Sequence, residues 1–320
     1  MGETGCHASF ILIVREKHKG VLNVSIFVSV VLPVLLVFGI GYAVEKWKKV
    51  DIGPISVVAI YIMTPCLVFE TFYDADIDRQ YLFMVIFSIA LLAVLIIVNK
   101  IVAKIAKQSK ETESGFILST AFMNSGNYGA PIILFAYGDE GFAYAVSFLV
   151  LQAIIMNLFG VYYAAKGHYG VGFAIRSVFK MPATYAVVLG VIVQSFGWTM
   201  PENIMMTVNI IAEATIPTVM IILGMQLAKM EWGQFAWGKV SYATVVRLFV
   251  SPLIAVGLTM IMPMDPLLSK VLIISAAMPS AATIVMYAVQ FNTQPRYVSS
   301  VTLVSTVLSV GTITLLLSIL

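Results

Sequence analysis

The sequence predicts an all-α membrane protein whose ten transmembrane helices form two inverted repeats of five, with helices 4 and 9 broken. The composition is the first observation: 60% of the residues are apolar and 11% are charged, whereas soluble domains carry about 25% charged residues. Apolar runs of about 20 residues, long enough to cross a bilayer, recur along the whole chain. The third observation is a set of prolines in matching spans of the two halves.

Short loops separate the apolar runs, so each run is interpreted as one span. The ten spans cover roughly residues 22–44, 52–72, 80–103, 114–137, 141–165, 173–196, 203–228, 239–261, 267–290 and 297–319. Together they form one transmembrane domain over residues 21–320, with repeat 1 at about 21–167 and repeat 2 at about 168–320. Residues 1–20 are predicted to be an N-terminal tail, because their apolar run is too short to span and lacks a signal-peptide layout.

The charged residues of the loops predict the topology. Most Lys and Arg residues lie in the loops that join an odd-numbered span to the next span, whereas the acidic segments 74–78 and 139–140 lie in the other loops. Cytoplasmic loops are enriched in Lys and Arg. The pattern therefore predicts a multi-pass protein of the cell (plasma) membrane with both termini outside.

The prolines suggest an internal repeat. Aligning spans 1–5 with spans 6–10 places Pro65 opposite Pro217, and Pro131 opposite Pro279. Because each half has an odd number of spans, the second half enters the membrane from the opposite side. This is the pattern of an inverted repeat, in which interrupted helices at matching positions indicate the binding site.

The middle of span 4 contains a stretch that should interrupt its helix, Asn124-Ser125-Gly126-Asn127-Tyr128-Gly129-Ala130-Pro131. Gly129 lowers helix propensity, and Pro131 cannot donate a hydrogen bond to the carbonyl of Asn127. Irregular backbone survives at membrane depth only where protein or a water-filled cavity surrounds it. We therefore expect the break in span 4 to line a site.

Span 9 has a similar break at Pro279, among small residues that let another backbone approach closely. If both spans break near the midplane they can cross there, and the N-terminal ends of their second halves would attract an anion. The predicted substrate-binding residues are Asn124, Gly126, Asn127, Pro131, Pro279, Ser280 and Thr283. Two alternatives remain: the freed carbonyls of Asn127 and Ser275 hold a cation, or the asparagines only satisfy broken backbone.

Two ionisable residues lie at similar depth inside predicted spans, Glu213 in span 7 and Arg247 in span 8. An unpaired charge at membrane depth is costly, so we expect a buried ion pair between them. In the alternative with a functional role, Glu213 takes up a proton during transport or Arg247 meets an anionic substrate.

Several function classes are disfavoured by the motifs. No span holds the paired carboxylates, nucleophile–base pair or metal motif that an intramembrane enzyme needs, so we expect no enzyme. No phosphate-binding glycine-rich loop ending in Lys-Ser/Thr is present, which argues against ATP-driven transport within this chain. We expect no metal, no cofactor beyond possible coupling to H⁺ or Na⁺, and no nucleic acid among the partners. A receptor without transport remains a minor alternative, and measured flux would exclude it.

At these broken spans the chain resembles the auxin efflux carrier family, which includes plant PIN-type carriers and prokaryotic malate and malonate permease-like members. The residues that carry the resemblance are Met63-Thr64-Pro65-Cys66-Leu67-Val68-Phe69 in span 2, Asn124, Pro131 and Phe135-Ala136-Tyr137-Gly138 in span 4, and Ala277-Met278-Pro279, Tyr287-Ala288, Phe291-Asn292-Thr293-Gln294-Pro295 and Ser299-Ser300-Val301 in and after span 9. The similarity covers about residues 21–320.

The resemblance implies a fold of the bile acid sodium symporter type and secondary transport of a small organic anion by elevator-like movement. It implies that Asn124 contacts the substrate, that Pro131 and Pro279 are the crossover prolines, and that a homodimer forms. The runner-up is a sodium-coupled symporter of the bile acid type. Val68 and Thr283 depart from the pattern of the plant carriers, which favours a small carboxylate such as malate or malonate over auxin.

Overall fold

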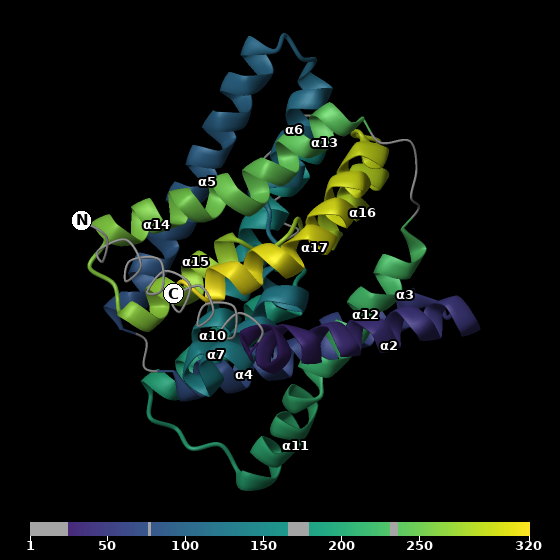
Figure 1. Cartoon of the computed structure of the whole chain (residues 1–320). Helices are drawn as coiled ribbons and strands as arrows, with labels where there is room; N and C mark the ends of the chain where they lie inside the picture. The colour runs from purple at the N-terminus through teal and green to yellow at the C-terminus, as the bar shows by residue number, and fades with distance from the viewer. Residues whose placement is uncertain (1–24, 76–77, 166–178, 231–235) are drawn as a thin grey trace, which may run out of the picture.

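The computed structural model describes residues 25–75, 78–165, 179–230 and 236–320, so the predicted tail over residues 1–20 lies outside the described part. The described chain is helical and contains one isolated backbone bridge but no strand. Its helices are α2 (Leu32–Lys48), α3 (Ile52–Val58), α4 (Thr64–Asp74), α5 (Arg79–Ile105), α6 (Lys110–Ala121), α7 (Ala130–Ile155), α8 (Val161–Ala164), α10 (Pro182–Ser195), α11 (Glu202–Glu213), α12 (Thr215–Lys229), α13 (Trp237–Val245), α14 (Ser251–Ile261), α15 (Pro266–Ala276), α16 (Ala282–Gln290) and α17 (Pro295–Leu317) (Figure 1).

Five π-helical turns extend or join these helices: η1 (Phe27–Val31), η2 (Ala59–Met63), η3 (Ser125–Gly129), η4 (Met156–Gly160) and η5 (Val246–Val250). With them, seven helical stretches of the described chain are long and apolar enough to cross a membrane: Phe27–Lys48, Ile52–Asp74, Arg79–Ile105, Ser125–Ala164, Glu202–Lys229, Trp237–Ile261 and Pro295–Leu317. The all-helical membrane class is thus confirmed. The count of ten spans and the two-repeat arrangement stay predictions.

Predicted spans 4, 6 and 9 do not each form a single long helix in the described chain. Predicted span 9 is divided between α15 and α16, and the first part of predicted span 4 is the separate helix α6. Predicted span 6 overlaps α10, and the first part of that span lies outside the described residues. The predicted boundary between spans 4 and 5 falls within α7 at Gly138, whose φ of 66° and ψ of −162° interrupt the helix. That backbone conformation is essentially restricted to glycine.

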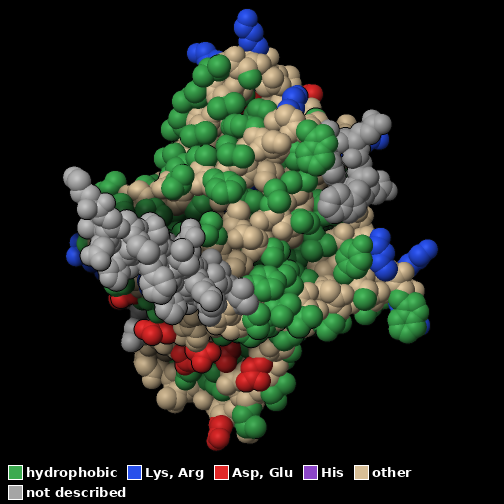
Figure 2. All heavy atoms as spheres, in the orientation of Figure 1, with side chains coloured by type: hydrophobic (Ala, Val, Ile, Leu, Met, Phe, Trp, Pro, Cys, Tyr) green, Lys and Arg blue, Asp and Glu red, His purple; other side chains and the backbone are tan. Residues whose placement is uncertain are grey.

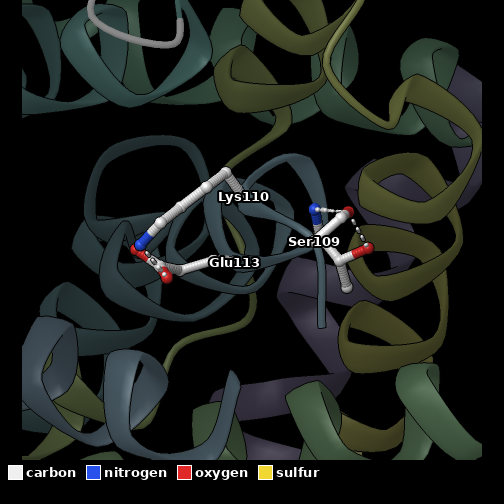
Figure 3. A network of polar contacts seen from close by, with 4 residues as sticks. Ser109, Lys110 and Glu113 are labelled. Atoms are coloured by element: carbon white, nitrogen blue, oxygen red, sulfur yellow. Dashed lines mark hydrogen bonds and ion pairs between the residues drawn. The ribbon is translucent and has the colours of Figure 1, made fainter. Parts of the chain in front are cut away.

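Side-chain caps determine where several helices begin. Ser109 precedes α6, and its hydroxyl accepts a hydrogen bond from the Thr112 backbone N–H at 3.2 Å. In the same turn the Lys110 ammonium lies 3.0 Å from the Glu113 carboxylate (Figure 3). Such caps satisfy backbone N–H groups that have no partner within the helix. Asp51, Asp78 and Asp265 play the same part for α3, α5 and α15.

The helices form two groups. In one, α2 packs along α12, and α4 packs against α10 and α11. In the other, which we call the crossover group, α5, α6 and α7 pack with α13 to α17. Helices α2, α4, α10 and α12 lie in predicted spans 1, 2, 6 and 7, so span 1 contacts span 7 and span 2 contacts span 6. An inverted repeat would relate span 1 to span 6 and span 2 to span 7. It would therefore turn the contact between spans 1 and 7 into the contact between spans 6 and 2.

The charged side chains are separated along the molecule. On the face shown in Figure 2, Asp and Glu side chains gather at the lower end, and most Lys and Arg side chains lie toward the top and the right. The upper region carries the C-terminal end of α5, and the right side carries that of α2, which includes Lys46 and Lys48 (Figure 1). This separation follows the loop charges on which the predicted topology rests.

Two glycines allow α2 and α12 to approach closely. A Cβ atom at Gly41 would overlap the backbone carbonyl of Ile221, and one at Gly224 would overlap the carbonyl of Phe38. Each glycine therefore faces backbone of the opposite helix, which cannot move aside as a flexible side chain can. Small residues at membrane helix contacts permit this spacing.

We predict that Gly41→Ala lowers the stability of the protein in detergent by about 1–3 kcal/mol, since overpacking forces the two helices apart. Thermal unfolding of the purified protein measures the effect. Gly39→Ala, on the same helix, is the matched control, because a Cβ there has no neighbour within 4 Å. Equal unfolding temperatures for the two variants would contradict the close contact.

Candidate functional site

The two broken segments meet in the crossover group. The chain leaves helical form after α6 and again after α15, and the two non-helical segments run antiparallel beside each other. The Asn124 backbone N–H donates to the Pro279 carbonyl at 2.9 Å. In return, the Ala281 backbone N–H donates to the Phe122 carbonyl at 3.1 Å. Each break thus supplies partners for the backbone groups that the other break exposes, as buried polar backbone requires.

The local sequence explains the geometry of this crossing. Pro131 is the second residue of α7, and α7 continues directly from the π-helical turn η3, so the proline lies inside a continuous helical stretch. Local π-helical adjustment is one way in which a membrane helix accommodates the N–H that proline lacks. Gly129 packs against span 9, because a Cβ there would lie 3.2 Å from Cγ of Met278. One expectation needs correction: the Ser275 carbonyl is not free, since it accepts a hydrogen bond from the Met278 N–H at 3.2 Å. The link after α15 closes into a tight turn instead of leaving that carbonyl exposed.

The second halves of both broken segments begin beside one cavity of about 310 Å³. Ser125, Gly126 and Asn127 line it from the first turn of η3, and Ala282 and Thr283 line it from the first turn of α16. The first backbone N–H groups of a helix lack partners within the helix and carry a partial positive charge of about 0.5. Both helix N-termini therefore direct positive potential at the same cavity.

Polar side chains of the crossover group complete this cavity. Asn124 lines it with 7% of its surface exposed, and its side-chain nitrogen has no hydrogen-bond partner. Gln152, also buried, lines the same cavity from α7. No described charged side chain is among the lining residues. A ligand in the cavity would thus meet amide donors, hydroxyl groups and helix N-termini.

The opposite wall comes from the other helix group and was missed by sequence reasoning. Thr64 and Thr215 line the cavity from α4 and α12, and Pro182 lines it from α10. The Thr215 hydroxyl donates to the Met63 carbonyl at 3.1 Å, which ties α12 to the turn before α4. Thr64 belongs to the span-2 motif that carries the family resemblance, but the motif does not indicate that its side chain faces the site. Thr215 carries no signal, because single threonines in apolar spans are common and do not indicate which helix they face.

Asn157 and Tyr287 form a polar contact at the rim of the same cavity. The Tyr287 hydroxyl donates to the Asn157 side-chain oxygen at 3.0 Å, and both residues line the cavity. The Asn157 side-chain nitrogen donates to the Ala153 carbonyl. Asn157 therefore bridges α16 to the helix that contains η4.

Three of the predicted site residues do not line the cavity. Pro131, Pro279 and Ser280 lie in or beside the crossing but are buried behind it. The Ser280 N–H donates to the Ser305 hydroxyl at 3.2 Å, which holds the break in span 9 against α17. These three residues shape the crossing, whereas Asn124, Gly126, Asn127 and Thr283 face the cavity. A role in substrate binding stays a prediction for all seven residues.

The structure does not bring Glu213 and Arg247 together. Arg247 is fully buried, and it donates from Nη1 to the Thr120 carbonyl at 2.6 Å and from Nη2 to the Ala276 carbonyl. These carbonyls belong to the last turns of α6 and α15. Glu213 is exposed and lines a different cavity. The expected ion pair is therefore wrong, because backbone carbonyls, not a carboxylate, balance the guanidinium.

Two further cavities of the described chain adjoin the central one. A cavity of about 650 Å³ contains the carboxylates of Glu70, Asp74, Asp139 and Glu213, and shares Leu67 and Ile216 with the central cavity. A cavity of about 640 Å³ contains Lys229 and Arg296 and shares Ala282 with it. The central cavity thus has an acidic neighbour on one side and a basic neighbour on another.

Comparison with known proteins gives a consistent assignment. The family model described as "Membrane transport protein" matches residues 26–169 and 171–317. A protein of Methanothermobacter thermautotrophicus named "Uncharacterized transporter" is 28% identical over 295 residues, which cover 87% of this chain and 93% of that protein. Another, from Methanocaldococcus jannaschii, is 27% identical over 300 residues and covers 90% of this chain and 96% of its own length.

A plant relative matches a shorter region. "Probable auxin efflux carrier component 1b" of Oryza sativa is 28% identical over 131 residues, which cover 39% of this chain and 24% of that protein. The family model covers nearly all of the described chain, and the apolar helices are of membrane-spanning length. The chain therefore belongs to the membrane transport protein family, the family of the auxin efflux carriers.

Proposed function

We propose that the protein is a secondary transporter that binds a small organic anion, a carboxylate such as malate, malonate or an auxin-like acid, in the central cavity. The observation that carries this proposal is the buried Asn124 side chain, whose amide nitrogen has no partner and which lies where the N-termini of η3 and α16 meet. An unsatisfied buried donor is costly, so a ligand acceptor at this point would stabilise the bound state.

The properties of the cavity support an anion of modest size. A volume of about 310 Å³ is at the lower end of the range of small-molecule sites, about 300–1,000 Å³. The lining carries no described carboxylate that would repel an anion. Helix N-termini and amide donors can hold a carboxylate without a fixed positive side chain. Membrane carriers use half-helix N-termini in this manner for anionic substrate groups.

The surrounding cavities support alternating access. One wall of the central cavity belongs to the crossover group, and the other belongs to α4, α10 and α12. We propose that the crossover group moves against α2, α4, α10 and α12, which would expose the site first to one neighbouring cavity and then to the other. Leu67 and Ile216 separate the site from the acidic cavity, and Ala282 adjoins the basic one.

The charge distribution supports an orientation in the membrane. We propose that the basic end faces the cytoplasm and that both termini lie outside the plasma membrane, because cytoplasmic loops favour Lys and Arg. Lys46, Lys48 and Lys104 lie in the last turns of α2 and α5 and would then be cytoplasmic. A homodimer remains a further prediction, taken from the family resemblance.

We predict that Asn124→Ala raises the apparent KM for the transported anion by about 10-fold or more. A hydrogen bond to a charged group contributes about 1.5–3 kcal/mol, and each 1.4 kcal/mol is a factor of about 10 in affinity. The measurement is uptake of labelled malate, malonate, a short monocarboxylate and indole-acetate into proteoliposomes. Asn124→Asp should abolish uptake, because it puts a carboxylate in the path of the anion.

Asn203→Ala, at the start of α11 and outside the central cavity, is the matched control for this experiment. Its uptake should equal that of the unmodified protein. Saturable uptake that Asn124→Ala leaves unchanged, with equal amounts of folded protein, would refute the central cavity as the anion site. Absence of flux for every anion tested would refute the proposed substrate class.

We further predict that Glu213 couples transport to a proton gradient. Glu213 faces the acidic cavity, whose wall residue Ile216 also lines the central one. A neutral side chain at this position cannot exchange a proton, so Glu213→Gln should lose stimulation by a pH gradient while retaining equilibrium exchange of the anion. Uptake with and without an imposed gradient measures this.

Glu202→Gln provides the control for this coupling role, since Glu202 lies at the other end of α11 and outside the acidic cavity. It should leave gradient stimulation intact. Equal stimulation of the Glu213→Gln and Glu202→Gln variants would exclude Glu213 as the coupling group.

A further inference from the structure

The two broken segments have four helix ends at their crossing, and these ends face different surroundings. The N-terminal ends, at η3 and α16, line the central cavity. The C-terminal ends, at α6 and α15, present the carbonyls of Thr120 and Ala276 to the guanidinium of Arg247. The crossing thus has a side that attracts anions and a side that attracts cations.

Arg247 has no carboxylate partner in the described part of the chain. Its hydrogen bonds go to the two helix-end carbonyls and to the Ser251 hydroxyl at 2.6 Å, and Ser251 itself donates to the Ala276 carbonyl at 2.9 Å. Each helix C-terminus carries about −0.5 elementary charge, so the two together balance roughly one positive charge. The guanidinium supplies that charge.

The surroundings of Arg247 are rich in oxygen atoms. Besides the two carbonyls and the Ser251 hydroxyl, the hydroxyl of Ser275, the residue before Ala276, is buried without a hydrogen-bond partner. Carbonyl and hydroxyl oxygens are the ligands that hard cations prefer. In carriers with broken helices, half-helix C-terminal ends and unwound carbonyls commonly coordinate Na⁺.

We propose that Arg247 is a tethered cation that occupies a latent monovalent-cation site between the C-terminal ends of α6 and α15. Its guanidinium joins the two half-helices and keeps their N-terminal ends directed at the central cavity without a free ion. Transport by the unmodified protein, which rests on the proposed function, is then independent of Na⁺. Removal of the side chain uncovers a site that accepts Na⁺ or guanidinium.

The first test measures stability and does not depend on transport. Purified Arg247→Ala is unfolded by heat in NaCl, in guanidinium chloride at millimolar concentration, or in choline chloride of equal ionic strength. We expect saturable stabilisation of this variant by Na⁺ or guanidinium, and none by choline, whose head group is too large for the site. The unmodified protein and Arg296→Ala, which removes an exposed arginine, should show no such ion-specific shift.

A solely structural role for Arg247 predicts a different result, namely a variant that is destabilised equally in all three salts. That result would overturn the proposal. If Arg247→Ala does not fold, Arg247→Gln, which keeps most of the side-chain volume, is produced and purified with and without guanidinium. Recovery of folded protein only with guanidinium supports the latent site, and recovery that is unaffected by guanidinium overturns it.

The second test uses the unmodified protein in proteoliposomes. Anion uptake should be unchanged when Na⁺ is replaced by choline on both sides of the membrane, and a strong requirement for Na⁺ would overturn the tethered-cation role. If no anion is transported at all, the proposed function fails, and the stability measurements on the Arg247 variants decide the cation site alone.

Discussion

The crossing of the two broken segments is the constraint on which the rest of the site depends. Two antiparallel backbone hydrogen bonds, from Asn124 to Pro279 and from Ala281 to Phe122, hold the breaks together. Because a helix end exposes unpaired polar groups, four such ends at membrane depth are tolerable only if each finds a partner. The C-terminal ends meet Arg247, and the N-terminal ends meet the central cavity. The crossing therefore has a negative side and a positive side because each unpaired backbone group at a helix end needs a partner.

The central cavity would bind a carboxylate through helix N-termini and amide groups, without a fixed charge. Such a site binds a carboxylate more weakly than an arginine would, which suits a carrier because a carrier must release its substrate. The one buried arginine of the crossing lies on the other side, where it neutralises the carbonyl ends of α6 and α15. The close contact of α2 with α12 through Gly41 and Gly224 would give the proposed movement of the crossover group a rigid partner. The acidic and basic cavities adjoin the site along the contact between the two groups.

The sequence was informative where local chemistry decides structure. Glycines and a proline between Asn124 and Pro131 predicted a break in span 4, but the non-helical residues are 122–124, and Gly129 and Pro131 lie within the helical stretch that begins at Ser125. The expected pair of Glu213 with Arg247 was wrong because counting residues into a span gives depth but not direction around the helix axis. The sequence did not indicate that Thr64 and Thr215 face the cavity, since this depends on how α4 and α12 rotate against their neighbours.

The sequence by itself determined the membrane class, the two broken segments and the charge asymmetry of the ends, whereas the count of ten spans stays a prediction. These properties follow from hydropathy, backbone propensity and the positions of Lys, Arg, Asp and Glu, which act over short stretches of chain. Only the tertiary structure decided which helix ends face the central cavity and which face Arg247. Thr120, Arg247 and Ala276 are far apart in sequence, and two of the three contribute backbone carbonyls, which every residue possesses. A contact to a backbone carbonyl depends on how whole helices pack, so no pattern of residue types in the sequence predicts it.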